Sequence, residues 1–105
     1  MAAFVLADVE VTDMDKYRDS GYLEDTPKIA ATYGGQYRVR GGQMHQLEGD
    51  WQPARMVIIE FPDMEKLLDF YNSDEYQPWI KVRQGLTKSR IVAVDGIADN
   101  SIRLE

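Results

Sequence analysis

The sequence lacks several features that would point directly to a function. It has no cysteine, which excludes disulfide bonds and thiolate chemistry, and one histidine, which is too few for a Cys/His zinc site. No hydrophobic run reaches the roughly 18 residues that a membrane-spanning helix needs, so we predict no membrane contact. Residues 1–11 lack the basic segment of a signal peptide, which favours a cytoplasmic location. We expect neither a metal nor a cofactor.

The charge of the chain is strongly acidic but unevenly distributed. The 105 residues carry a net charge of −6, which argues against general nucleic-acid binding, because that depends on neutralising phosphates with Lys and Arg. No acid lies between Glu75 and Asp95, whereas four bases do. These bases are Lys81, Arg83, Lys88 and Arg90. They indicate either a local site for an anion or a solvated helix face and strand end, and we prefer the second interpretation.

The stretch YGGQYRVRGG, residues 33–42, has two glycine pairs around a short alternating segment. A phosphate-binding loop would run from a strand through glycines into a helix, whose N-terminus holds the anion. Here a predicted helix precedes the first pair and a predicted strand follows it, and neither GxGxxG nor GxxxxGK[ST] is present. We therefore interpret Gly34 and Gly35 as the end of a helix, and Gly41 and Gly42 as the end of a strand.

Periodicity and capping residues predict the other elements. Alternating apolar side chains predict strands over 3–11, 36–40, 55–61 and 89–96. We predict a first helix that begins at a Thr12 capping box and restarts at Thr26. Two further helices are predicted to begin at Asp63 and at Ser73. Residues 43–54 read as a hairpin arm. The expected buried stripes of the last two helices are Leu67, Leu68 and Tyr71, and then Trp79, Val82 and Leu86.

This order of elements, β-α-β-β-α-(α)-β, is typical of a ferredoxin-like sandwich. We predict an α+β fold with a four-stranded antiparallel sheet in the order 4-1-3-2 and helices on one face. A single domain is expected over residues 1–96, followed by a tail over 97–105.

Both faces of the predicted sheet are apolar, although helices cover only one. One set of strand residues is Phe4, Leu6, Met56, Ile58, Ile91 and Ala93, and the other includes Val5, Val57, Ile59 and Val92. Whichever face the helices cover, the remaining one is too apolar to face water. We therefore predict a homodimer formed sheet against sheet.

Five segments together resemble the domain-of-unknown-function family 1330 over residues 2–96. These segments are AFVLADVEVTD, YGGQYRVRGG, LEGDW, MVIIEFPDMEKLLDFYNSDEYQ and IVAVDG. The resemblance implies a dimeric α/β barrel, in which two ferredoxin-like subunits appose their sheets. That superfamily includes cofactor-free monooxygenases, isomerases, cyclases and haem enzymes, whereas family 1330 carries no established reaction. The resemblance therefore implies a fold without a function.

Charged and aromatic residues near the sheet are the candidates for a binding site. We expect Arg38 to lie opposite Glu60 across the second and third strands. Arg40 has no matching acid on the third strand, so it would hold an anion or pair with an acid such as Asp8. Three aromatic residues would wall and orient a ligand, or fill the core. The candidate substrate-binding residues are Tyr17, Arg38, Arg40, Glu60, Tyr76 and Trp79.

The sequence assigns no catalytic residue. We interpret His45 as an exposed residue of the hairpin arm in preference to a general base or a haem ligand. No serine lies in the G-x-S-x-G motif of a hydrolase nucleophile. Two functions remain open. The first is a homodimer that binds a small organic metabolite, anionic or neutral, with or without cofactor-independent turnover. The second is a non-catalytic structural or stress-associated dimeric module without a ligand.

Overall fold

The computed structural model describes residues 1–97, which form alternating strands and helices. The strands are β1 (Ala3–Val11), β2 (Gln36–Arg40), β3 (Met56–Phe61) and β4 (Thr87–Asp95). The helices are α1 (Met14–Asp19), α2 (Tyr22–Thr32), α3 (Met64–Tyr71) and α4 (Gln77–Leu86). The predicted tail lies outside the described residues, except for Ile97. No helix within residues 1–97 has the length and apolar character needed to cross a membrane.

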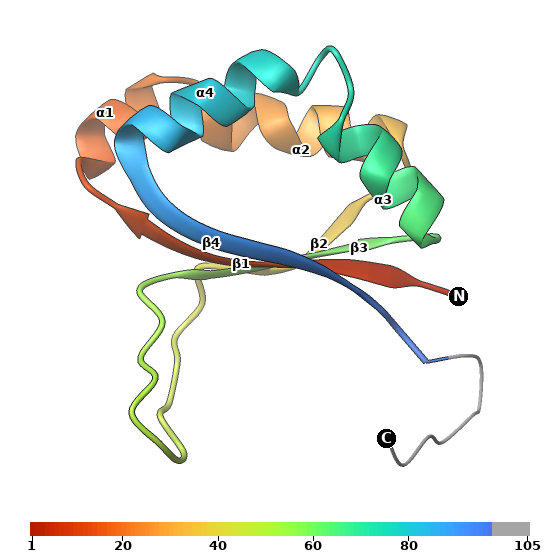
Figure 1. Cartoon of the computed structure of the whole chain (residues 1–105). Coiled ribbons are helices and arrows are strands. Elements are labelled where there is room, and N and C mark those ends of the chain that lie inside the picture. The colour runs from red at the N-terminus through yellow and green to blue at the C-terminus, as the bar shows by residue number, and fades with distance from the viewer. Residues whose placement is uncertain (98–105) are drawn as a thin grey trace.

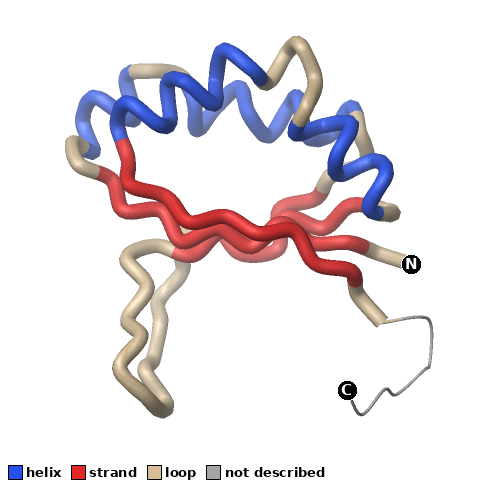
Figure 2. Tube along the Cα trace, viewed as in Figure 1, coloured by secondary structure: helices blue, strands red, loops and turns tan. Residues whose placement is uncertain are grey.

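The four strands form one antiparallel sheet in the order β2-β3-β1-β4. All four helices lie on the same side of this sheet, as Figure 1 and Figure 2 show. The predicted strand order and the ferredoxin-like sandwich are therefore confirmed. The third predicted strand lies between β2 and β1, which explains its run of apolar and β-branched residues, because both of its edges are paired.

The hydrophobic core lies between the helices and one face of the sheet. Alternation in β1 puts Ala3, Val5, Ala7 and Val9 on this face, and all four are buried. Their partners across the sheet and from the helices complete the core. The largest fully buried side chains are Tyr17, Phe61, Phe70, Leu67 and Thr26.

The opposite face of the sheet is open, and its apolar residues differ in part from the prediction. Leu6 pairs with Val92 and Phe4 with Val94 in the register of β1 and β4. Val92 and Val94 therefore lie on the open face, and their side chains are 62% and 47% exposed. The predicted members Ile91 and Ala93 face the helices instead, because a shift of one residue moves a strand residue to the other face. We call Phe4, Leu6, Met56, Ile58, Val92 and Val94 the open-face patch.

The first two helices begin at other residues than predicted. Asp13 rather than Thr12 caps α1, since its carboxylate accepts a hydrogen bond from the backbone N–H of Lys16 at 3.1 Å. Thr12 instead donates its hydroxyl to the carbonyl of Leu86. Helix α2 begins after Gly21, whose φ of +87° gives a sharp turn. Thr26 is consequently inside α2 and not at its start.

The glycine pair at 34–35 ends α2 as predicted. Gly34 has a left-handed φ of +81°, the usual conformation of the residue that follows a helix. Gly35 is required for a different reason, because it is buried against Phe61. A Cβ atom at residue 35 would lie 2.8 Å from Cε1 of Phe61. Gly34 therefore allows the chain to turn at the end of α2, and Gly35 allows close packing against Phe61. This explains the pair without a phosphate-binding loop.

Helices α3 and α4 bury different stripes from those predicted. Asp63 caps α3 as expected, accepting from the N–H of Lys66 at 2.8 Å. However, α3 buries Leu67 and Phe70, whereas Leu68 is 46% exposed. Helix α4 buries Ile80 and Arg83 rather than the predicted Trp79, Val82 and Leu86, which are only partly buried. Its buried stripe is thus displaced by one residue and includes a charged side chain.

The arm between β2 and β3 projects from the sheet on the side away from the helices (Figure 1). Residues 41–55 contain no strand, so the predicted hairpin is a two-legged loop. Side-chain bonds hold its legs together, since Gln46 donates to the carbonyl of Gly49 and Gln52 donates to Gln46, both at 2.6 Å. Leu47 is 94% exposed in this loop.

Candidate functional site

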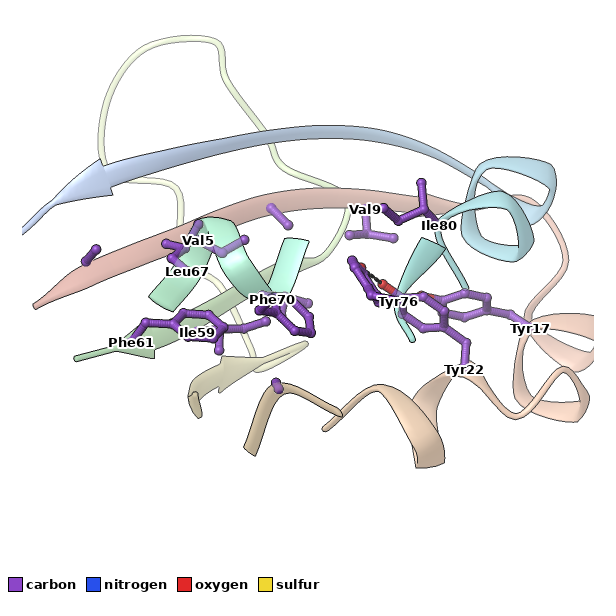
Figure 3. Close-up of a cluster of buried hydrophobic side chains, with 14 residues drawn as sticks. Val5, Val9, Tyr17, Tyr22, Ile59, Phe61, Leu67, Phe70, Tyr76 and Ile80 are labelled. Carbon is purple, nitrogen blue, oxygen red and sulfur yellow. Dashed lines mark hydrogen bonds between the residues drawn. The ribbon is translucent and has the colours of Figure 1, made fainter. Parts of the chain in front are cut away.

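A cavity lies between the sheet and the helices at the end of the core where the aromatic residues gather. It offers about 40 Å³ to the centres of water-sized molecules, which is room for a small polar group. Figure 3 shows Tyr17, Tyr22 and Tyr76 together at this end, while Phe61, Leu67 and Ile59 pack at the other. The polar or aromatic lining residues are Tyr17, Tyr22, Tyr37, Arg40, Arg55, Phe70, Tyr71, Tyr76 and Arg83.

Arg40 reaches this cavity because strand β2 contains a bulge. Tyr37 pairs with Ile59, but Val39 pairs with Ile58, so Arg38 is the extra residue. After the bulge, Arg40 lies opposite Val57 on the helix-covered face. Regular alternation over the predicted strand 36–40 would put Arg40 on the same face as Arg38. The single inserted residue reverses the alternation, so the two arginines lie on opposite faces of the sheet.

A helix carbonyl and an aromatic ring hold the guanidinium of Arg40. Pro27 lies inside α2 and has no N–H to donate to the carbonyl of Leu23, four residues before it. Arg40 donates Nη2 to that carbonyl instead. Its Cζ atom also lies 5.4 Å from the ring centroid of Tyr37, a cation–π distance. Arg40 thus completes the hydrogen bonding of α2 while lining the cavity.

Arg83 is a buried lining residue whose guanidinium lacks hydrogen-bond acceptors. Its side chain is 3% exposed, and within residues 1–97 its Nε and Nη1 atoms have no hydrogen-bond partner. The salt bridges within residues 1–97 involve Arg18, Lys28, Arg38 and Arg90, and not Arg83. A buried guanidinium without an acceptor costs free energy. A carboxylate or another oxyanion in the cavity would remove that cost, because guanidinium groups bind such anions through paired N–H donors.

The charge of the cavity is opposite to that of the chain. Arg40, Arg55 and Arg83 line it, and its lining residues, which run from Val5 to Ile91, include no Asp, Glu, His or Lys. The whole sequence nevertheless has a net charge of −6. Three cations therefore line a space whose lining offers no anion, with Arg83 buried, Arg55 partly buried and Arg40 exposed, so the cavity attracts a negative ligand.

The tyrosines supply neutral hydroxyl groups beside these cations. Tyr22 and Tyr76 share a hydrogen bond of 2.5 Å between their hydroxyls, drawn in Figure 3. Burial raises the pKa of Tyr17 to about 12, although nearby Arg55, Arg83 and Arg40 act to lower it. Burial also raises the pKa values of Tyr22 and Tyr76. All three hydroxyls therefore remain protonated near neutral pH. One member of the Tyr22–Tyr76 pair donates its proton to the other, so Tyr17 and the second member of that pair can donate hydrogen bonds to an anion.

The predicted site residues divide between the two faces of the sheet. Tyr17, Arg40 and Tyr76 line the cavity. Arg38 and Glu60 form the predicted pair, with Nε and Oε1 3.1 Å apart, but on the open face and away from the cavity. Trp79 lies outside the lining, with its ring against Tyr22 and Gly21. The structure thus brings together half of the predicted set.

The predicted binding set omits five polar or charged lining residues. Arg83 lay within the base-rich segment for which an anion site was one interpretation, and Tyr71 was predicted as a buried residue of its helix. Tyr22 and Tyr37 could have been found only by knowing which side of α2 and which face of β2 meet the cavity. The omitted residues are Tyr22, Tyr37, Arg55, Tyr71 and Arg83.

His45 lies in the projecting arm, apart from the cavity. It borders a shallow surface depression with Met44, Leu47 and Trp51. Within residues 1–97, no three His, Cys, Asp or Glu side chains are grouped so that they could hold a metal ion.

Comparisons with known proteins identify a family and a fold. A family model described as a domain of unknown function (DUF1330) matches residues 2–97. A solved protein of unknown function from Rhodopseudomonas palustris aligns with a TM-score of 0.72 and 18% identity, covering 92% of this chain and 83% of that one. SnoaB, a cofactor-independent oxygenase from Streptomyces nogalater, aligns with a TM-score of 0.56 and 13% identity, covering 94% and 95%. No curated protein matches the chain. At these identities the structural likeness shows the fold alone.

Proposed function

The chain belongs to the DUF1330 family, and from that premise we propose that it binds a small organic anion in the cavity between its sheet and helices. The observation that carries this proposal is Arg83, a guanidinium that is 3% exposed and has two nitrogen atoms, Nε and Nη1, without a hydrogen-bond partner within residues 1–97. An anion held there would accept hydrogen bonds from Arg83 and from the neutral hydroxyls of Tyr17 and Tyr76.

The lining favours binding over proton-transfer catalysis. A general base must hold a free electron pair near neutral pH and lie within hydrogen-bond reach of the substrate. The lining residues include no carboxylate or imidazole. Arginine stays protonated, and the pKa of Tyr17 is raised to about 12. Such groups hold and orient an anion but are poor at removing a proton from it.

The test compares carboxylates with uncharged amides of the same shape. We expect butyrate and benzoate to raise the melting temperature of the purified protein, whereas butyramide and benzamide should not, because only the carboxylates satisfy Arg83. A ligand that binds only the folded state at 100 times its Kd contributes about 2.7 kcal/mol. For a chain of this size, each kcal/mol raises the melting temperature by roughly 4–8 °C.

Sodium chloride at matched ionic strength is the control for general salt effects. Equal shifts with the acids and their amides, or no shift with either carboxylate, would contradict anion binding.

We also propose that the protein is a homodimer whose subunits meet through the open-face patch. The charged residues around this patch balance one another, because Arg38 pairs with Glu60 and Arg90 with Asp8, at 3.1 and 3.2 Å. Two copies of a chain with a net charge of −6 repel each other where their acidic surfaces meet. Two neutral apolar faces can meet without that repulsion. Such a face is self-complementary in a twofold dimer.

A charge placed on the open-face patch should dissociate the dimer. Val92→Glu puts two like charges into the proposed interface, at a cost of several kcal/mol, while the side chain remains exposed in the monomer. We expect sedimentation equilibrium to give twice the 12.0 kDa chain mass for the wild type and about one chain mass for this variant. Leu68→Glu is the matched control, because Leu68 is 46% exposed on the helix layer. A monomeric wild type, or a dimeric Val92→Glu variant, would contradict the proposed interface.

A further inference from the structure

A surface groove adjoins the cavity beside the end of α4. Its volume is about 380 Å³, and it is open to solvent. Tyr71, Arg83 and Ile91 line both spaces, so the cavity and the groove meet at these side chains. The groove is completed by Gln84, Thr87 and Ser89. A molecule that places a charged group beside Arg83 can therefore extend past Tyr71 into a second, polar space.

The hydrogen bonds in the groove determine what its hydroxyls can offer. Thr87 donates its single hydroxyl proton to the carbonyl of Arg83 at 2.7 Å. Oγ of Ser89 lies 2.7 Å from Oγ1 of Thr87, so Ser89 must be the donor in that contact. With both protons committed, Ser89 presents only lone pairs to a ligand. The neighbouring amide of Gln84 both donates and accepts.

The groove therefore suits groups that donate hydrogen bonds without carrying positive charge. An ammonium group would be repelled by Arg83, which lines the same groove. A hydrocarbon chain would cover the polar groups of Gln84 and Ser89 without replacing their water. Hydroxyl groups meet both conditions, because each can donate to Ser89 and accept from Gln84.

We propose that the ligand is a polyhydroxylated carboxylate, with its carboxylate on Arg83 in the cavity and its hydroxyl groups in the groove. This inference rests on the proposed anion-binding function and names the chemical class of the anion. It makes Gln84 and Ser89 determinants of specificity, while Arg83 remains the anchor for charge.

The test compares two six-carbon carboxylates by isothermal titration calorimetry. Gluconate carries five hydroxyl groups, whereas hexanoate carries the same charge on a hydrocarbon chain. The hydroxyl groups of gluconate can form hydrogen bonds with Ser89 and Gln84, so we expect gluconate to bind at least tenfold more tightly than hexanoate, a difference of about 1.4 kcal/mol. Equal affinities, or tighter binding of hexanoate, would overturn the inference but leave anion binding intact. If neither binds, both proposals fail.

Two groove variants test whether Ser89 and Gln84 cause the preference for gluconate. Ser89→Ala and Gln84→Met should each weaken gluconate binding severalfold and leave hexanoate binding unchanged, because both side chains lie in the groove and outside the cavity lining. Gln36→Met is the matched control, since Gln36 is exposed in β2 at the other edge of the sheet. A gluconate preference that survives both groove variants would place its hydroxyl groups elsewhere and overturn the assignment.

Discussion

Replacement of Arg83 by Met should stabilise the ligand-free protein and abolish anion binding. Methionine keeps the unbranched stem and the helix propensity of arginine but carries no charge. Replacing a buried ion pair by apolar side chains stabilises a protein by up to about 1–4 kcal/mol, and we expect a gain in the free energy of unfolding within this range when a buried guanidinium without an acceptor is removed. Loss of its charge-assisted hydrogen bonds should weaken carboxylate binding about 100-fold, since bonds to charged groups contribute about 1.5–3 kcal/mol each.

The two expected effects of Arg83→Met have opposite signs, which separates a binding role from a structural one. If Arg83 only supported the fold, its removal would lower the melting temperature together with any binding. Arg18→Met is the control, because the Arg18 side chain in α1 is 64% exposed and, within the described residues 1–97, forms its salt bridge with Asp15. It should change neither measurement. A less stable Arg83→Met variant, or one that still shows the carboxylate-dependent rise in melting temperature, would contradict the anchor role.

The features that sequence reasoning predicted well are those fixed by local patterns. Alternation in β1 correctly put Val5 and Val9 on one face, which the structure shows to be the buried one, and the run that became β3 was correctly placed inside the sheet. Asp63 was recognised as a helix cap, and Gly34 as the residue that ends α2. In each case neighbouring residues determine the outcome through periodicity, a cap or a backbone conformation, so the signal is present in a short segment.

The site was harder to predict because it depends on two departures from regular patterns. The bulge at Arg38 turns Arg40 from the open face to the cavity, and no residue type in that strand marks the extra residue. In α4, the apolar spacing of Trp79, Val82 and Leu86 suggested a buried stripe that would leave Arg83 in solvent. The structure buries Ile80 and Arg83 instead. A charged residue at a core position breaks the hydrophobic pattern, which is expected where stability is given up for function.

Raising the pH above about 10 should destabilise the protein steeply, because its buried tyrosines resist ionisation. The folded-state pKa of Tyr17 is raised to about 12 and those of Tyr22 and Tyr76 are raised as well, mainly by burial, whereas an unfolded tyrosine ionises near pH 10. Above pH 10 the unfolded chain thus loses phenolic protons that the folded chain keeps, so the unfolding free energy falls as pH rises. Each such tyrosine contributes about 1 kcal/mol per pH unit.

Three tyrosines acting together should therefore cost several kcal/mol between pH 10 and pH 12, a large part of the 5–15 kcal/mol typical of a domain. Urea unfolding at successive pH values measures this fall, and tyrosinate absorbance should rise together with unfolding. Tyr17→Phe keeps the ring packing, with its ring centroid 5.3 Å from that of Tyr22, and removes one titrating group. It should reduce the slope by about 1 kcal/mol per pH unit, whereas an unchanged slope would mean that Tyr17 ionises at its ordinary pKa.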